Sequence, residues 1–215
     1  MWFFKLGDRL WHSDSSFRPI PAKYSLLSGR ILPSWGANTE FADMRAAYDA
    51  LDERTKAEVE NLICEHSLIY SREAIGFTDL TEDEIAAFEP VRQRLVRIHP
   101  VTGRKSLFLS SHAGAIVGWT IPEARMFLRD LTEHATQREF IYSHEWQPYD
   151  LVMWDNRTTM HRARRFGLLN IKLCVIVRID YNSISPFQFF ICSHQSQSRN
   201  SGSQKFYQRR IRIPK

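Results

Sequence analysis

The sequence contains only three cysteines, Cys64, Cys174 and Cys192, and no CxxC pair. An odd number of cysteines without that spacing indicates neither a disulfide framework nor a cysteine-rich zinc cluster. Free thiols persist in a reducing compartment, so the cysteine content favours the cytoplasm.

Long hydrophobic runs are absent as well. The longest apolar stretches, such as residues 173–177, fall well short of the roughly 18 residues that a membrane-spanning helix needs. The N-terminus does not combine a basic start with a long apolar run and a small-residue cleavage site. We therefore predict no membrane span, no secretory signal and a cytoplasmic location.

Only the C-terminal end of the chain has few acidic residues. The chain has 29 Lys and Arg, 24 Asp and Glu and a formal net charge of +5. Residues 167–215 hold eight of the basic residues and one acidic residue, Asp180, so residues 1–166 are slightly acidic. The basic tail contains no recognisable nucleic-acid-binding module, so we expect no nucleic-acid partner.

The remaining composition is that of one globular domain. Of the 215 residues, 43% are hydrophobic and 25% are charged, which suffices for a sizeable core. Apolar periodicity predicts helices over residues 43–51, 53–66, 81–88 and 122–135. Asp43 and Asp52 are suited as N-caps, and Thr81 with Glu84 three residues later forms a capping-box pattern.

Short β-prone segments separate these helices. They cover residues 22–27, 91–98, 106–109, 139–144, 150–154 and 158–164. Thr102 and Gly103 predict a hairpin turn between two of these strands. Many short strands with helices between or outside them indicate a mainly β fold with helices, of the α+β class, arranged as a jelly roll.

A His-x-Asp triplet, His12-Ser13-Asp14, lies close to the N-terminus. In an extended segment the side chains alternate between faces, so His12 and Asp14 point the same way and can share one ion. Another histidine, His161, lies far downstream. Two imidazoles and one carboxylate form the facial triad that holds Fe(II) and leaves coordination positions open.

The residues around this triad form a longer pattern. The segments LWHSDSSF, GANTEFAD, HPVTGRKSL and DLVMWDNRTTMHR follow one another at residues 10–17, 36–43, 99–107 and 150–162. This set resembles the taurine dioxygenase (TauD/TfdA) family of Fe(II)/2-oxoglutarate-dependent dioxygenases, and most closely its 2,4-dichlorophenoxyacetate dioxygenase branch. The resemblance covers about residues 8–166.

The resemblance implies a double-stranded β-helix in which His12, Asp14 and His161 bind Fe(II). It also implies that the Thr39 hydroxyl binds 2-oxoglutarate and that His112 contacts the substrate. The family has a further 2-oxoglutarate anchor, an arginine shortly after the distal histidine. The corresponding window, residues 172–175, contains no arginine, and Lys172 is its only basic residue.

The activity implied by the resemblance is hydroxylation of a small organic acid. O2 and the cosubstrate 2-oxoglutarate are consumed, and succinate and CO2 are released. The expected substrate is an aryloxyacetate of the 2,4-dichlorophenoxyacetate type, which would break down to a phenol and glyoxylate after hydroxylation. Sulfonates and other small organic acids stay open as substrates, and a homo-oligomer is compatible with the sequence.

Two features set the chain apart from the family pattern. Its short N-terminal segment predicts a partial, N-terminally truncated jelly-roll dioxygenase domain over residues 1–166. Residues 167–215 change from apolar to basic and Ser-rich, and they are either a divergent strand with a disordered tail or sequence out of frame. The alternative to an active enzyme is therefore a truncated, catalytically inactive family remnant or a mispredicted gene product.

Overall fold

The computed structural model describes residues 7–30 and 32–165 in full, and residues 174–179 by their backbone. Within these ranges the chain combines helices with short strands, and all strand pairs are antiparallel. This agrees with the predicted mixture of helices and strands. None of the described helices is long and apolar enough to cross a membrane.

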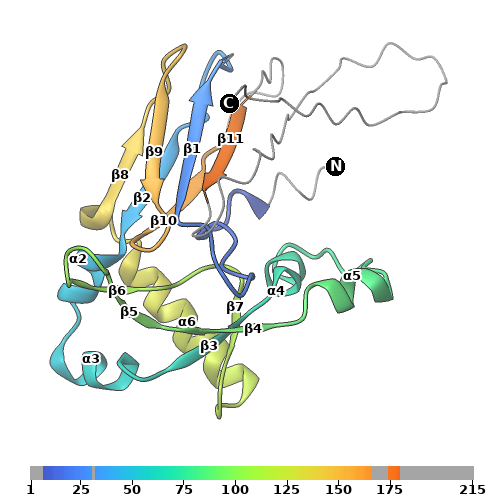
Figure 1. Cartoon of the computed structure of the whole chain (residues 1–215), viewed down its shortest axis with the longest axis vertical. Helices are drawn as coiled ribbons and strands as arrows, with labels where there is room; N and C mark the ends of the chain where they lie inside the picture. Colours follow the sequence, from blue (N-terminus) through green and yellow to red (C-terminus); the bar gives the residue numbers. More distant parts are fainter. Residues whose placement is uncertain (1–6, 31, 166–173, 180–215) are drawn as a thin grey trace, which may run out of the picture.

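Two three-stranded sheets occupy the upper part of the molecule in Figure 1. In one, β1 (Tyr24–Gly29) lies between β9 (Leu151–Asp155) and β11 (Cys174–Ile179). In the other, β2 (Thr39–Asp43) lies between β8 (Ile141–His144) and β10 (Thr159–Ala163). Strand β11 belongs to the segment that we predicted to be atypical, and the rest of residues 167–215 lies outside the described residues.

The lower part holds the remaining strands and most helices (Figure 1). Strand β3 (Ile63–His66) pairs with β4 (Val91–Arg94) and β7 (Ala113–Ile116), and β5 (Val96–Ile98) forms a hairpin with β6 (Lys105–Leu107). The helices are α2 (Met44–Asp49), α3 (Glu53–Val59), α4 (Leu68–Glu73), α5 (Glu82–Ala87) and α6 (Ile121–Ala135), with a 3-10 turn at Arg138–Phe140.

The predicted helix caps are confirmed. The Asp43 side chain accepts hydrogen bonds from the first amides of α2, and the Asp52 side chain accepts from Thr55 at the start of α3. Thr81 and Glu84 form the expected capping box of α5. The hairpin is confirmed as well, because Ile98 pairs with Lys105 across a turn in which Gly103 has a φ of 69°. Glycine adopts this left-handed conformation without a Cβ clash.

The predicted helix over residues 53–66 is wrong in its second half. Helix α3 ends at Val59, and residues 63–66 form strand β3 instead. Cys64 and His66 are buried, and strand β3 pairs with β4 on one side and with β7 on the other. This strand pairing outweighs the helical spacing of the apolar residues in the sequence. Helix α4 and strands β2 and β7 were not predicted, because each is short and has no clear period.

The core lies between the long helix α6 and the strands above it. Leu128 and Leu131 of α6 pack in one cluster with Leu107, Ile116 and Met160, which come from three different strands. Met160 is the neighbour of His161 on β10. The strand that contains this predicted metal ligand is therefore anchored in the core.

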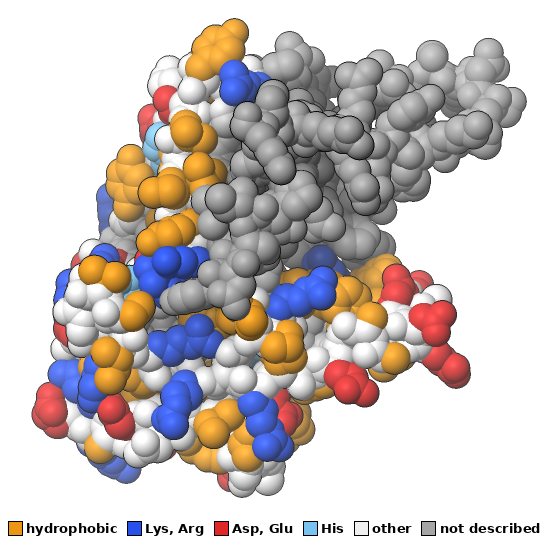
Figure 2. All heavy atoms as spheres, in the orientation of Figure 1, with side chains coloured by type: hydrophobic (Ala, Val, Ile, Leu, Met, Phe, Trp, Pro, Cys, Tyr) orange, Lys and Arg blue, Asp and Glu red, His pale blue; other side chains and the backbone are white. Residues whose placement is uncertain are grey.

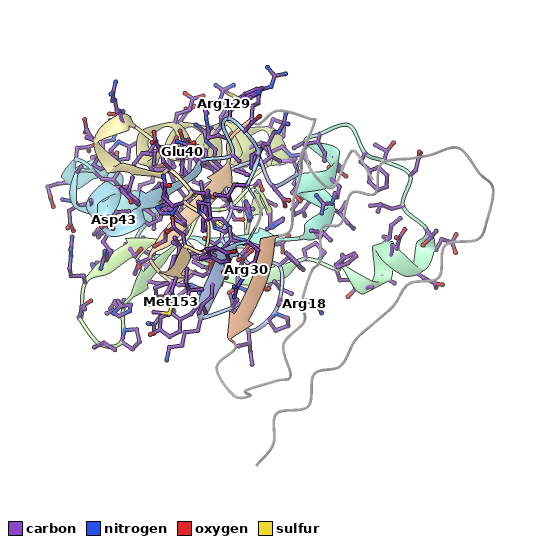
Figure 3. All side chains as sticks on the ribbon, turned by 90° about the horizontal axis from the view of Figure 1, so that it is seen from above. Arg18, Arg30, Glu40, Asp43, Arg129 and Met153 are labelled. Atoms are coloured by element: carbon purple, nitrogen blue, oxygen red, sulfur yellow. The ribbon has the colours of Figure 1, made fainter. Side chains whose placement is uncertain are left out.

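The outer face of β9 is apolar and exposed. Leu151 and Met153 are 65% and 61% exposed, whereas Trp154 between the sheets is 7% exposed. Figure 2 shows hydrophobic side chains gathered over this upper part of the molecule, and Figure 3 labels Met153. Strand β9 therefore has apolar residues on both faces, and only its inner face contributes to the site.

Candidate metal centre

The three predicted metal ligands lie together. His12 forms an isolated antiparallel bridge with His161 of β10, in which each backbone amide donates to the other residue's carbonyl at 3.0 and 2.9 Å. This bridge places the N-terminal segment beside β10. The ligand atoms of His12, Asp14 and His161 all lie within 4.8 Å of one another.

Burial and packing hold these side chains in place. Asp14 is 3% exposed and His161 is 8% exposed. The His161 ring lies 4.2 Å from the His12 ring and 4.6 Å from the ring of Trp154, centroid to centroid. Phe41 on the neighbouring strand stacks on the His161 ring at 6.2 Å. Aromatic walls of this kind limit the access of water to the three donor groups.

A backbone hydrogen bond selects the tautomer of His12. Nδ1 of His12 lies 2.8 Å from the carbonyl oxygen of Leu10, so Nδ1 carries the proton and donates it to that acceptor. The lone pair of Nε2 is then available, and Nε2 lies 3.8 Å from Oδ1 of Asp14. Metal-binding histidines typically donate their other ring proton to a carbonyl or carboxylate in this way.

The donor set fits a divalent iron ion. Two imidazole nitrogens and one carboxylate oxygen, without soft thiolate ligands, form the 2-His-1-carboxylate arrangement of non-haem Fe(II) oxygenases. Such a facial triad leaves positions open for further ligands. Among the described residues, this is the one group of three His, Cys, Asp or Glu side chains with such spacing.

Thr39 lies on the strand next to β10. It is 5% exposed and pairs with Ala163, two residues after His161, so Thr39 and His161 project from the same face of the sheet. The Thr39 hydroxyl oxygen accepts a hydrogen bond from the indole N–H of Trp146 at 3.0 Å. Sequence patterns gave no reason to expect this contact, because Trp146 lies in an irregular segment after β8.

His112 also lies near the triad. Its ring is 6.2 Å from the His12 ring and 4.9 Å from the ring of Phe17, and the residue is 7% exposed. Burial holds the pKa of His112 well below its usual value. The structure therefore places His112 beside the triad, and its contact with a substrate stays a prediction. Lys172, the remaining predicted site residue, lies outside the described residues.

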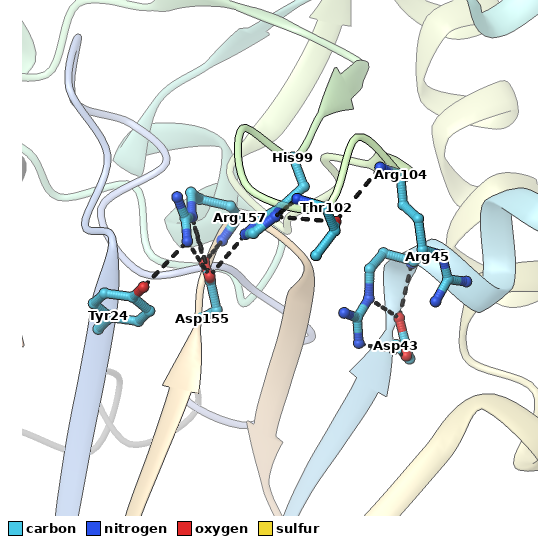
Figure 4. A network of polar contacts seen from close by, with 8 residues as sticks. All are labelled: Tyr24, Asp43, Arg45, His99, Thr102, Arg104, Asp155 and Arg157. Carbon is cyan, nitrogen blue, oxygen red and sulfur yellow. Dashed lines mark hydrogen bonds and ion pairs between the residues drawn. The ribbon is translucent and has the colours of Figure 1, made fainter.

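The turn between β9 and β10 is fixed by a separate polar network, drawn in Figure 4. The Arg157 guanidinium donates to both oxygens of the Asp155 carboxylate and to the hydroxyl of Tyr24, and His99 Nε2 lies 3.3 Å from Asp155. Burial alone would raise the pKa of Asp155, but the hydrogen bonds from Arg157 hold it below its usual value. This network holds the turn in place and anchors the start of β10.

Comparison with protein families agrees with the site. A model of the family described as taurine catabolism dioxygenase TauD, TfdA matches residues 4–170. The chain is 50% identical over 162 residues to the alpha-ketoglutarate-dependent 2,4-dichlorophenoxyacetate dioxygenase of Cupriavidus pinatubonensis, covering 75% of this chain and 56% of that protein. It is 47% identical over 163 residues to the (S)-phenoxypropionate/alpha-ketoglutarate-dioxygenase of Sphingobium herbicidovorans, covering 73% and 57%.

Solved structures include similar chains. The crystal structure of AAD-2 in complex with Mn(II) and N-oxalylglycine has a TM-score of 0.82 and 60% sequence identity, and the match covers 85% of this chain and 73% of that chain. The present chain spans a little over half the length of the curated relatives that it matches.

Proposed function

Because the chain belongs to the taurine catabolism dioxygenase TauD, TfdA family, we propose that it is an Fe(II)- and 2-oxoglutarate-dependent dioxygenase. The observation that carries this proposal is the meeting of His12, Asp14 and His161 in one partly enclosed cluster. His161 lies far from His12 and Asp14 in the sequence, and only the folded chain brings it to them. The two upper sheets, with His161 and Thr39 on neighbouring strands of one sheet, support a double-stranded β-helix as its architecture.

The proposed substrate is a small aryloxy acid. The relatives named above act on 2,4-dichlorophenoxyacetate and (S)-phenoxypropionate, which share an aromatic ether and a carboxylate. Phe17 and His112 form an edge-to-face pair beside His12, and such a pair suits an aromatic ring. His112 is the residue that we assign to substrate contact.

The cosubstrate is assigned to the space between the triad and Thr39. Because Trp146 donates to the Thr39 oxygen, the Thr39 hydroxyl proton is directed to a different acceptor. We assign that acceptor to the distal carboxylate of 2-oxoglutarate. Lys172 is the basic residue that the sequence offers as a second anchor, and its point charge lacks the two-pronged geometry of arginine.

The residues of this chain would divide the work as follows. When bound, Fe(II) would activate O2, whose four oxidising equivalents are used by 2-oxoglutarate and the substrate, two by each: one oxygen atom ends in succinate, formed with CO2 from 2-oxoglutarate, and the other enters a substrate C–H bond. His12, Asp14 and His161 hold the ion and keep positions open for cosubstrate and oxygen. Trp154 and Phe41 shield the ligands from water, and Thr39 and His112 orient the two organic acids.

Product analysis tests this proposal. Purified protein, supplied with Fe(II), 2-oxoglutarate, O2 and 2,4-dichlorophenoxyacetate, is expected to release succinate together with a phenol and glyoxylate in equal amounts. The His161→Ala variant should form no succinate. His134→Ala is the matched control, because the His134 ring lies on α6 and its hydrogen bond is not with a residue of the triad.

Two other results would point elsewhere. Turnover that persists in His161→Ala would contradict the triad assignment. Folded wild-type protein that binds iron but makes no succinate would favour the alternative proposal, a catalytically inactive family member.

A further inference from the structure

The carboxylate of Asp14 is held by buried groups that are not metal ligands. Its Oδ2 atom accepts a hydrogen bond from the Ser25 hydroxyl at 2.6 Å. The Ser25 oxygen in turn lies 2.8 Å from Nδ2 of Asn156. Ser25 and Asn156 are both 0% exposed, so water does not replace either contact. A carboxylate that is about to bind a metal is thus already fixed at one oxygen.

We propose that Ser25 and Asn156 are positioning residues that make Asp14 bind the metal through one oxygen, Oδ1. This inference rests on the proposed iron centre and adds to it two residues, Ser25 and Asn156, that position the carboxylate of Asp14.

The direction of each hydrogen bond follows from groups that can only donate. Oδ1 of Asn156 lies 3.0 Å from the indole Nε1 of Trp154 and 3.2 Å from the backbone nitrogen of Asp14. Both nitrogens carry a proton and cannot accept, so they fix the orientation of the Asn156 amide. Its NH2 group therefore faces Ser25 and donates to the hydroxyl oxygen.

The orientation of Ser25 follows in the same way. With a lone pair engaged by Asn156, the Ser25 hydroxyl directs its proton to Oδ2 of Asp14. A hydrogen bond to a charged acceptor is roughly twice as strong as a neutral one, which agrees with the short 2.6 Å distance. The order of donation runs from Trp154 through Asn156 and Ser25 to the carboxylate, and the order cannot be reversed.

The fold sets the position of each member. Ser25 lies on β1 directly opposite Trp154 of β9, and the backbone amide of Asn156 donates to the carbonyl of Lys23 at 3.0 Å. The ring of Trp154 also packs 4.6 Å from the ring of His161. One network therefore restrains the carboxylate ligand and contacts the distal histidine ligand.

The other oxygen of Asp14 faces the first histidine. Oδ1 lies 3.8 Å from Nε2 of His12, whereas Oδ2 is directed to Ser25 and lies 4.0 Å from Nε2 of His161. Coordination through Oδ1 alone preserves the open positions of the facial triad. A carboxylate bound through both oxygens would fill one of the positions that 2-oxoglutarate and O2 need.

Metal titration without turnover tests this inference. Co(II) replaces Fe(II) as a probe whose visible spectrum reports the number and kind of its ligands. Two variants are compared with wild type. Ser25→Ala removes the hydroxyl that donates to Asp14. Asn156→Asp keeps the size of the side chain but removes its NH2 group, so that Ser25 donates to the new carboxylate instead of to Asp14. Ser28→Ala is the matched control on the same strand, because Ser28 is half-buried and is not a member of the network.

We expect Ser25→Ala and Asn156→Asp to bind Co(II) roughly 10- to 100-fold more weakly than wild type, as for other residues that orient metal ligands. Their visible spectra should differ from that of wild type, and Ser28→Ala should match wild type in both measurements. A purely structural role would lower the melting temperature without altering the spectrum of the bound ion. The Asn156→Asp variant answers the question if Ser25→Ala does not fold.

Two outcomes would overturn the inference, and they are distinguishable. Wild-type affinity and spectrum in both folded variants would show that Asp14 needs no positioning, while the iron centre would stand. Folded wild-type protein that binds no Co(II) at all would remove the proposed iron centre itself.

Discussion

His66 is an ionisable side chain that lies outside the triad and is fully buried. It is 0% exposed, stacks on Phe108, and neither ring nitrogen has a hydrogen-bond partner. Burial lowers the pKa of His66 to about 3, with a smaller effect from Arg97. In the unfolded chain His66 therefore binds a proton near pH 6.5. In the folded chain it binds this proton only at a far lower pH.

This difference predicts an acid sensitivity. Since the unfolded state binds more protons between these two pKa values, His66 destabilises the fold progressively as pH falls below about 6.5, by roughly 1.4 kcal/mol per pH unit. The His66→Leu variant should lose this dependence. The measurement is the free energy of unfolding in urea for both proteins between pH 7 and pH 5, and parallel curves would contradict the assignment.

The hydroxyl of Thr39 is expected to act on cosubstrate binding alone. Thr39→Val keeps the shape of the side chain and removes one hydrogen bond to a charged carboxylate, a contact worth roughly 1.5–3 kcal/mol. We expect the half-saturating concentration of 2-oxoglutarate to rise at least about tenfold, with Co(II) affinity unchanged. Trp146→Phe should give a smaller effect of the same sign, because it frees the hydroxyl without removing it. Unchanged 2-oxoglutarate affinity in Thr39→Val would exclude Thr39 as an anchor.

Helix α6 shows how one face of an element carries its stability. Leu128 is 5% exposed in the core cluster, while Met126 on the same helix is 60% exposed. Leu128→Ala should lower the free energy of unfolding by about 2–5 kcal/mol because it leaves a cavity. Met126→Ala should change it by less than about 0.5 kcal/mol. Chemical denaturation of both variants checks the prediction, and equal losses would mean that the helix does not pack as described.

The elements differ in how well the sequence predicts them. Caps such as Asp43 and Thr81 act locally, through amides two or three residues away, so the sequence pattern suffices to place them. Strand β3 depends on partners far along the chain, and its helical spacing misled the prediction. Strand β9 has apolar residues on both faces, so apolar character alone does not show that Met153 is exposed whereas Trp154 is buried.

The site was predictable to a similar degree. The triad was predicted from its residue types together with the ordered motifs that resemble the family, and the bridge between His12 and His161 brings the three residues together in space. Ser25 was not predictable, because a serine on a short strand has no pattern of its own. Its role depends on the register that sets it opposite Trp154. Residues of this kind are found only when the whole fold is known.

Taken as a whole, the molecule should be stabilised by the metal it binds. The ligands come from the N-terminal segment and from β10, so the ion would tie together parts of the chain that are distant in sequence. A ligand at a hundred times its dissociation constant adds about 2.7 kcal/mol to the folded state if the unfolded chain does not bind it. We expect Mn(II) to raise the melting temperature of wild type and not of His161→Ala. An equal shift in both proteins would mean that the metal binds elsewhere.

The most direct measurement is an anaerobic titration of the purified protein with Fe(II) and then 2-oxoglutarate, followed by visible absorption. If His12, Asp14 and His161 hold iron with open positions, a weak charge-transfer band should grow as 2-oxoglutarate is added. Its intensity at saturation should correspond to one iron per chain. The band should be absent in Asp14→Ala. Folded wild-type protein that shows no band, or a band that survives in Asp14→Ala, would contradict the proposed iron centre.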